Sequence, residues 1–231
     1  IHNERIKLIK KLHSSKGRKE LKQFIAEGER TVEVFSQSGW IPKDIFVIKS
    51  MLPKVVSFFS IEPTLVSESV MRKISTAQSP SGIVALFDIP ENNLATITSP
   101  GLVLSHISDP GNMGTLIRSS VAFGSKSIII INGCDPYSPK VIQSSAGTIA
   151  QSNILLWSWK ELLQKNTEYD LCGLIVKDGA PIETIDPKKS LLVLGNESLG
   201  LSKEEIQDCQ STITLPMNKE VESLNAAIAG S

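Results

Sequence analysis

The chain has 231 residues, of which 41% are hydrophobic, and its 24 basic and 24 acidic residues give a net charge of zero. This length allows one large or two ordinary domains with packed cores. No apolar run reaches the 18 or so residues of a membrane span, and no signal peptide is visible. We therefore expect a cytoplasmic protein without a membrane partner.

The cysteine spacing disfavours two further classes of protein. Cys134, Cys172 and Cys209 are far apart and form no C-x-x-C pair. A disulfide framework and a zinc cluster are therefore both disfavoured, and a reducing compartment is favoured. We expect no bound metal.

The start of the chain is basic. Apolar side chains recur at helical intervals, which predicts helix over residues 4–38. Eight basic residues crowd the first 22 positions against only Glu4 and Glu20: Arg5, Lys7, Lys10, Lys11, Lys16, Arg18, Lys19 and Lys22. Such a stretch can contact the phosphates of a nucleic acid, and a solvated helix face is the alternative interpretation.

Hydrophobic periodicity predicts the remaining elements. Strands are expected at 45–48, 82–87, 102–104, 127–131, 153–156, 171–176, 191–194 and 213–215. Helices are expected at 67–74, 112–123, 159–164 and 202–209, and residues 138–150 are expected to be mostly helix or turn. Ser202 and Glu205 fit a capping box at the start of the last of these helices.

A linker divides the chain. Residues 88–93 are polar and contain proline, and Ser-Pro-Gly breaks the chain again before residue 102, so we place the linker at 91–100. We expect an N-terminal domain at 1–90 and a second domain at 101–231. Because strands alternate with helices in the second domain, we predict an α/β fold with a parallel sheet covered on both faces.

A polar turn directly follows the first strand of this second domain. Its sequence, Asp-Pro-Gly-Asn, is typical of a turn, and Asn112 is a plausible N-cap for the next helix. Gly111, Gly114 and Arg118 then share one helical face, so two residues without side chains adjoin one cation. That arrangement suits the close approach of a phosphate or ribose. An ordinary turn with a surface arginine is the alternative, and the spacing leaves both open.

Two later strands also end in polar segments. The run 192–194 opens into a glycine-flanked loop with one carboxylate, Glu197, and the strand at 213–215 stops at Pro216 before small polar residues at 223–225. Ligands bind at the carboxyl ends of strands in open α/β sheets, so the two ends predict one pocket. The first loop nearly matches a phosphate-binding P-loop, but its lysine is absent and Glu197 would repel phosphates.

These motifs resemble a known family. Residues 109–124, 192–201 and 213–229 are similar to the three signature motifs of the SpoU/TrmH family of RNA ribose 2′-O-methyltransferases, in the SPOUT superfamily. The stretch 138–147 resembles the segment between the first two motifs, and the order and spacing match throughout 100–231. Residues 1–90 resemble, more loosely, the family's N-terminal substrate-binding domain of ribosomal-protein type.

The resemblance implies a fold and a cofactor. The C-terminal part of the sheet would thread a trefoil knot, an exception to the rule against knots. The protein would be a homodimer that uses S-adenosylmethionine and acts on RNA. Residues that would contact the cofactor are Gly195, Asn196, Leu215, Met217 and Leu224. Residues at the family's functional polar positions are Asn112, Arg118, Glu197, Ser223 and Asn225.

Roles for these polar residues follow from their chemistry. Arginine does not readily lose a proton, since its pKa exceeds about 12. We therefore expect Arg118 to clamp a phosphate or hydroxyl instead of acting as a base. Asn112, Ser223 and Asn225 would orient the ribose, and Glu197 would organise its loop.

The sequence departs from the family pattern at a few positions. Ser198 and Lys219 stand where glycine is common, and Ala226-Ala227 replaces a usual Val-Ser pair. Most family members continue several residues beyond the position of Ser231, so we expect a final helix that is incomplete or partly disordered.

The resemblance leaves the RNA open. The added N-terminal domain favours ribosomal RNA, and a tRNA 2′-O-methyltransferase or a base methyltransferase of the same superfamily is an alternative. A non-catalytic RNA-binding or assembly factor with this fold is another, against which the intact Asn112, Arg118, Ser223 and Asn225 argue.

Overall fold

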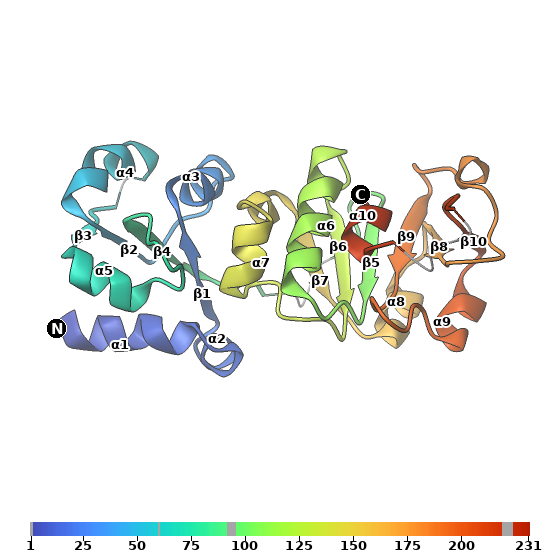
Figure 1. The fold of residues 1–231 in the computed structure, drawn as a ribbon, viewed down its shortest axis with the longest axis horizontal. Helices are drawn as coiled ribbons and strands as arrows, with labels where there is room; N and C mark the ends of the chain where they lie inside the picture. The colour runs from blue at the N-terminus through green and yellow to red at the C-terminus, as the bar shows by residue number, and fades with distance from the viewer. Residues whose placement is uncertain (1, 60, 92–95, 219–223) are drawn as a thin grey trace. The chain divides into compact units, whose positions relative to one another are not determined.

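The computed structural model describes residues 2–59, 61–91, 96–218 and 224–231. Contacts within the chain define two compact units, whose elements are drawn in Figure 1. The first unit comprises Ile1–Glu91 and Asp135–Gln151, and the second comprises Asn92–Cys134 and Ser152–Ser231. Part of the expected linker, 92–95, lies outside the described residues.

The first unit is built on a four-stranded sheet. Its strands run in the order β1 (Gln23–Glu27), β4 (Ile83–Asp88), β2 (Asp44–Val47) and β3 (Thr64–Leu65). Strand β4 is antiparallel to both β1 and β2, whereas β2 and β3 are parallel. Strands β2 and β4 confirm the strands predicted at 45–48 and 82–87.

Helices complete the first unit. They are α1 (His2–Leu12), α2 (Ser15–Leu21), α3 (Glu29–Gln37), α4 (Leu52–Phe58), α5 (Glu68–Ile74) and α7 (Pro139–Ser144), with short 3₁₀ turns η1 (Lys49–Met51) and η2 (Thr148–Gln151). Helix α5 confirms the helix predicted at 67–74, and the Ser67 hydroxyl caps it by accepting from the Val70 amide. Helix α4 was not predicted.

The prediction of helix throughout 4–38 is wrong at residues 23–27, which form β1. Leu21, Phe24 and Ile25 are spaced as on a helix face, and the same residues also suit a buried strand. Helix α2 ends at Leu21 and is followed by the C-cap residue Lys22, whose φ of 51° is left-handed. The following Phe24-Ile25-Ala26 run is buried and pairs with β4 along its whole length, so pairing in the sheet decides its structure.

Aromatic side chains fill one side of the first unit's core. The rings of Phe35 and Phe87 stack with centroids 4.7 Å apart, and Phe24 lies 5.7 Å from each of them. Tyr137 packs against Phe24 at 4.9 Å, and the Trp40 indole N–H donates to the Ala150 carbonyl at 2.9 Å. The segment 135–151 is therefore part of the first unit's core. A single boundary at the linker would instead assign this segment to the second domain.

A buried ion pair holds this segment. The Arg18 guanidinium donates from Nε to Asp135 Oδ2 at 2.7 Å and from Nη1 to the Leu12 carbonyl at 2.7 Å. Only 4% of the Arg18 side chain is exposed. Arg18 therefore belongs to the folded core, which fits neither interpretation of the basic stretch, a phosphate-binding surface or a solvated helix face.

We expect Arg18→Ala to lower the free energy of unfolding of the first unit by about 3 kcal/mol, because it leaves a half-buried carboxylate without its partner. Urea unfolding followed by circular dichroism measures this loss. Lys19→Ala, at an exposed neighbouring position, is the matched control. Equal stability of the two variants would contradict a structural role for the pair.

The second unit is built on a six-stranded sheet in which every strand is parallel to its neighbours. The order is β10 (Ser211–Ile213), β8 (Asp170–Leu174), β9 (Ser190–Leu194), β5 (Gly101–Ser105), β6 (Ser127–Ile131) and β7 (Asn153–Leu156). This confirms the predicted parallel α/β sheet. The strand predicted at 213–215 is wrong in its position, since pairing with β8 begins at Ser211 and ends at Ile213.

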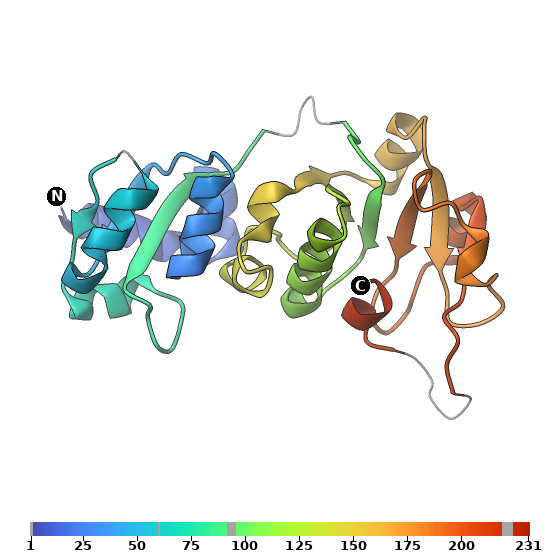
Figure 2. The same ribbon diagram turned by 90° about the horizontal axis from the view of Figure 1, so that it is seen from above.

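Helices cover both faces of this sheet, as Figure 2 shows. Helices α8 (Trp159–Lys165) and α9 (Lys203–Asp208) pack on one face with Val103, Ile129 and Val193. Helices α6 (Pro110–Ala122) and α10 (Ala226–Ala229) contact each other on the opposite face, and η3 (Ile182–Thr184) is a short turn. The capping box predicted at Ser202 and Glu205 is confirmed.

Strand order places two loops side by side. Strands β5 and β9 are adjacent and parallel, with Leu104 paired with Leu194. The loops that follow them therefore begin next to each other, at the point where the connection from β5 leads to β6, toward one edge of the sheet, and the connection from β9 leads to β10, at the other edge. The trefoil knot stays a prediction, since residues 219–223 lie outside the described part of the chain.

Candidate functional site

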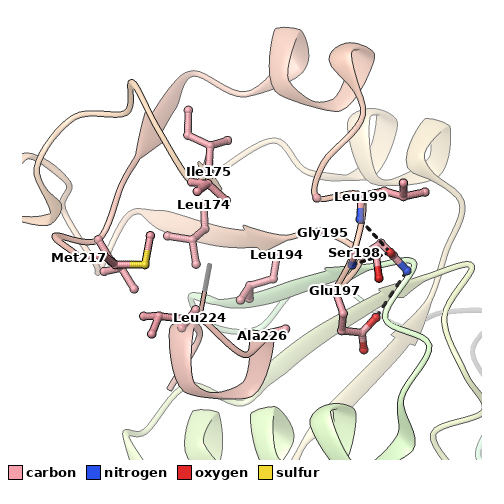
Figure 3. A pocket seen from close by; sticks show the side chains of 15 residues that line it. Leu174, Ile175, Leu194, Gly195, Glu197, Ser198, Leu199, Met217, Leu224 and Ala226 are labelled. Atoms are coloured by element: carbon pink, nitrogen blue, oxygen red, sulfur yellow. Dashed lines mark hydrogen bonds between the residues drawn. The ribbon is translucent and has the colours of Figure 1, made fainter. Parts of the chain in front are cut away.

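A pocket of about 210 Å³ lies at the carboxyl ends of the second unit's strands. Its wall is largely apolar, and Figure 3 shows Leu174, Leu194, Met217 and Leu224 around one side of it. All the residues predicted to contact the cofactor line this pocket: Gly195, Asn196, Leu215, Met217 and Leu224. The sequence did not predict the lining residues at the end of β8, just after β8 and on α10: Leu174, Ile175, Val176, Ala226 and Ala229.

A tight loop forms the polar side of the pocket. Asn196 and Gly200 exchange backbone hydrogen bonds, of 3.1 Å to the Gly200 carbonyl and 2.9 Å to the Asn196 carbonyl. A Cβ at Gly195 would lie 2.2 Å from the carbonyl carbon of Gly200, so only glycine fits there. The Asn196 side chain accepts from the Ser198 and Leu199 amides and donates to the His106 carbonyl at 2.9 Å.

The Glu197 carboxylate joins this loop to the turn after β5. One oxygen accepts from the Ser108 amide at 3.2 Å and its hydroxyl at 3.1 Å. The other accepts from the Asp109 amide at 3.1 Å and from Nδ2 of Asn112 at 3.2 Å. Glu197 therefore organises the two loops, and Ser108, which the sequence did not single out, is one of its partners.

These bonds keep Glu197 ionised. Burial by itself would raise the pKa of its carboxyl, but hydrogen bonds led by backbone amides outweigh burial and hold this pKa below its usual value of 4.5. A low pKa makes Glu197 a poor proton acceptor. The carboxylate consequently acts as a structural anchor.

Asn112 does not cap α6, contrary to the prediction. The helix begins at Pro110, and the Asp109 side chain is the cap, accepting from the Asn112 amide at 2.7 Å. A proline suits the first helical position because the missing N–H needs no partner there. The Asn112 side chain is thereby released from capping and lies between Glu197 and Asn225.

Hydrogen bonds fix the orientation of both asparagine amides. Asn112 donates to Glu197, and its Oδ1 accepts from Nδ2 of Asn225 at 3.1 Å. Asn225 Oδ1 in turn accepts from the Ala227 amide at 2.9 Å, which caps α10. Each amide has a second N–H that these bonds do not use.

The other predicted polar residues differ in their surroundings. Arg118 is exposed on α6, and within the described ranges it has no hydrogen-bond or ion-pair partner. Gly114 is buried together with Met113 and Leu116, so it does not border an open surface beside Arg118 as predicted. Ser223 and Lys219 lie outside the described residues.

Two absences hold for the described part of the chain. It contains no cluster of three or more His, Cys, Asp or Glu side chains arranged to hold a metal ion. Nor does any of its helices combine the length and apolar character needed to cross a membrane.

An open parallel sheet with a ligand-sized pocket at its carboxyl edge defines the class of α/β proteins that bind a small molecule there. Residues 100–231 match the model of the SpoU rRNA Methylase family, and residues 3–85 match that of the MRM3-like substrate binding domain. The chain belongs to the SpoU rRNA methylase family.

Named relatives are similar over nearly the whole chain. The 23S rRNA (guanosine(2553)-2′-O)-methyltransferase RlmP of Bacillus subtilis is 30% identical over 98% of this chain and 93% of its own. The 23S rRNA (uridine(2479)-2′-O)-methyltransferase of Streptomyces viridochromogenes is 24% identical, over 90% and 79%. The AdoMet-bound rRNA methyltransferase from Sinorhizobium meliloti is 26% identical with a TM-score of 0.86, covering 100% of this chain and 92% of that one.

We expect Glu197→Gln to destabilise the second unit by about 1–2 kcal/mol at pH 7, because charge-assisted hydrogen bonds weaken. The pKa of the Glu197 carboxyl is lower in the folded than in the unfolded protein. The ionised carboxylate therefore stabilises the fold at any pH above the unfolded pKa, and this stabilisation is lost as the pH falls through the folded pKa. The difference in stability between Glu197→Gln and the unmodified protein should therefore shrink as the pH falls below 4.5, the usual pKa of this carboxyl. Thermal unfolding of both proteins between pH 3 and 7 measures this difference in stability.

Glu204→Gln is the control for this experiment. Glu204 is exposed in the first turn of α9, so its replacement should lower stability by no more than about 0.5 kcal/mol, the scale of one exposed charge near a helix N-terminus. A Glu197→Gln variant as stable as this control would contradict the anchoring role.

Proposed function

We propose that the protein is an S-adenosylmethionine-dependent methyltransferase that modifies a ribose 2′-hydroxyl of ribosomal RNA. The observation that carries this proposal is the bonded series Asn225–Asn112–Glu197, which joins α10, α6 and the β9 loop beside the apolar pocket. Membership of the SpoU family supports it, as do relatives named as 23S rRNA 2′-O-methyltransferases and an AdoMet-bound structural neighbour.

The pocket fits the proposed cofactor. Leucine and methionine side chains offer an apolar surface for a purine, while the loop 195–200 supplies backbone peptide groups to the lining. Gly195, Asn196, Leu215, Met217 and Leu224 would hold the cofactor. When bound, it supplies a methyl group on a positively charged sulfur.

The chain's own residues would position the other reactant. Each of Asn112 and Asn225 has a second amide N–H that no residue described by the structure accepts, and these groups can bind ribose oxygens. Ser223 is proposed to join them. Arg118, with its guanidinium unpaired within the described ranges, can clamp a phosphate or the hydroxyl oxygen and stabilise negative charge that develops on it. Positioning of this kind can lower a barrier by several kcal/mol.

The unmodified protein should restore a 2′-O-methyl group to ribosomal RNA in a strain that lacks it, and Arg118→Ala should not. With RNA purified from that strain, we expect Arg118→Ala to lower kcat by about 100-fold or more. Cofactor affinity, measured by calorimetry, should change little because Arg118 does not line the pocket.

Lys126→Ala, which removes an exposed cation elsewhere in the second unit, is the matched control. Undiminished methylation by a folded, cofactor-bound Arg118→Ala variant would exclude the proposed role. If the 2′-O-methyl group is found only in transfer RNA, the substrate is transfer RNA and not ribosomal RNA. If the protein does not bind the cofactor, it is a non-catalytic factor.

We further propose that the protein acts as a cytoplasmic homodimer. Phe123, at the end of α6, is 79% exposed and Ile228, on α10, is 68% exposed. The two helices contact each other, and Ser119 and Ser231 are bonded at 2.8 Å. Exposed apolar side chains on adjoining helices are typical of an interface.

Sedimentation velocity should give twice the chain mass for the unmodified protein, and Phe123→Asp should give a single chain because a buried charge would oppose association. Leu163→Asp, at a 43% exposed position on α8, should leave the dimer intact. A single chain for the unmodified protein would rule out the homodimer.

A further inference from the structure

The first unit has a pocket of its own, of about 140 Å³. It lies among the end of β1, the segment before β4 and the start of α7, and its lining consists of Ile25, Glu27, Gly28, Thr76, Ala77, Ser79, Ser81, Pro139, Ile142 and Gln143. Ile25 and Ile142 are each 1% exposed and form an apolar base. Thr76, Ser79 and Gln143 are exposed and make a polar rim.

Hydrogen bonds to Glu27 hold this rim in place. One carboxylate oxygen accepts from the Thr76 amide at 2.8 Å and the Thr76 hydroxyl at 2.5 Å. The other accepts from the Ser75 hydroxyl, which itself accepts from the Ala77 amide at 3.1 Å. A carboxylate oxygen has about two lone-pair sites, so the second oxygen retains room for one more donor.

The charge of the pocket indicates a neutral ligand. Among the described residues that line it, Glu27 is the one charged side chain. A carboxylate repels phosphate and accepts N–H groups. An apolar base, a hydroxyl-bearing rim and a free acceptor together suit a flat heterocycle with polar edges, which is the chemistry of a nucleobase.

Cations lie close to each lining segment in the sequence. Arg30 follows Gly28, Lys73 precedes Thr76, and Lys140 follows Pro139. All three cations are exposed, and none is in an ion pair with another residue that the structure describes. Exposed cations of this kind can bind the phosphates of neighbouring nucleotides while the pocket itself takes the base.

We propose that this pocket binds one unpaired nucleobase of the RNA substrate, with Glu27 accepting an N–H group from the edge of the base. The proposal rests on the proposed function, since it assumes an RNA substrate. It assigns selection of a single-stranded site to the first unit, through residues of β1, the 76–81 segment and α7.

Ala77→Trp tests the pocket, because a large side chain at this exposed position would fill it while keeping the backbone bond to Ser75. Gln78→Trp, on the same segment but outside the lining, is the matched control. Fluorescence anisotropy would measure binding of two labelled RNAs of equal length, a hairpin with an unpaired loop of mixed sequence and a fully paired duplex.

The unmodified protein and Gln78→Trp should prefer the hairpin. Ala77→Trp should lose about tenfold in affinity for the hairpin, as expected for contacts to one base, and none for the duplex. Guanosine should compete with the hairpin for the unmodified protein, and inorganic phosphate at equal ionic strength should not.

Three outcomes would overturn the proposal: no preference for the hairpin, equal hairpin binding by Ala77→Trp and the unmodified protein, or competition by phosphate alone. Cofactor calorimetry on the same samples separates this failure from failure of the proposed function. If the protein binds cofactor and methylates RNA, and Ala77→Trp has the same KM for RNA as the unmodified protein, only the proposed base pocket is contradicted. If Ala77→Trp weakens hairpin binding but the unmodified protein methylates no RNA, only the proposed enzymatic function is contradicted.

Discussion

The site in the second unit depends on one carboxylate. Glu197 accepts hydrogen bonds from the turn after β5 and from α6, although it follows β9. Adjacent parallel strands bring the two loops together, and the carboxylate fixes their spacing because it satisfies several donors at once. Since the pKa of Glu197 is lowered, this link remains charged near neutral pH.

Hydrogen bonds connect the Glu197 carboxylate to α10 through two asparagine side chains. Glu197 orients Asn112, Asn112 orients Asn225, and Asn225 caps the helix that lines the pocket. A disturbance of the carboxylate would therefore reach both the apolar pocket and the polar groups beside it. Rigid support of this kind is what precise placement of two reactants requires.

The first unit relies on a different kind of anchor. Segment 135–151 leaves β6, enters the aromatic core of the first unit and returns to β7. The buried Arg18–Asp135 pair and the packing of Tyr137 on Phe24 hold it there. The same segment contributes Pro139, Ile142 and Gln143 to the proposed base pocket, so stability and substrate selection would share one piece of chain.

Periodicity and short motifs in the sequence predicted the parallel sheet, most strand and helix positions and the family, because they are local properties that the chain carries without folding. It also brought Gly195, Leu215 and Leu224 together correctly as neighbours of one pocket. The folded structure was needed to show that residues 23–27 form a strand and that Asn112 bonds Glu197, 85 positions away, instead of capping α6. Strand pairing and bonds between distant side chains depend on which segments pack together, and no local pattern encodes that.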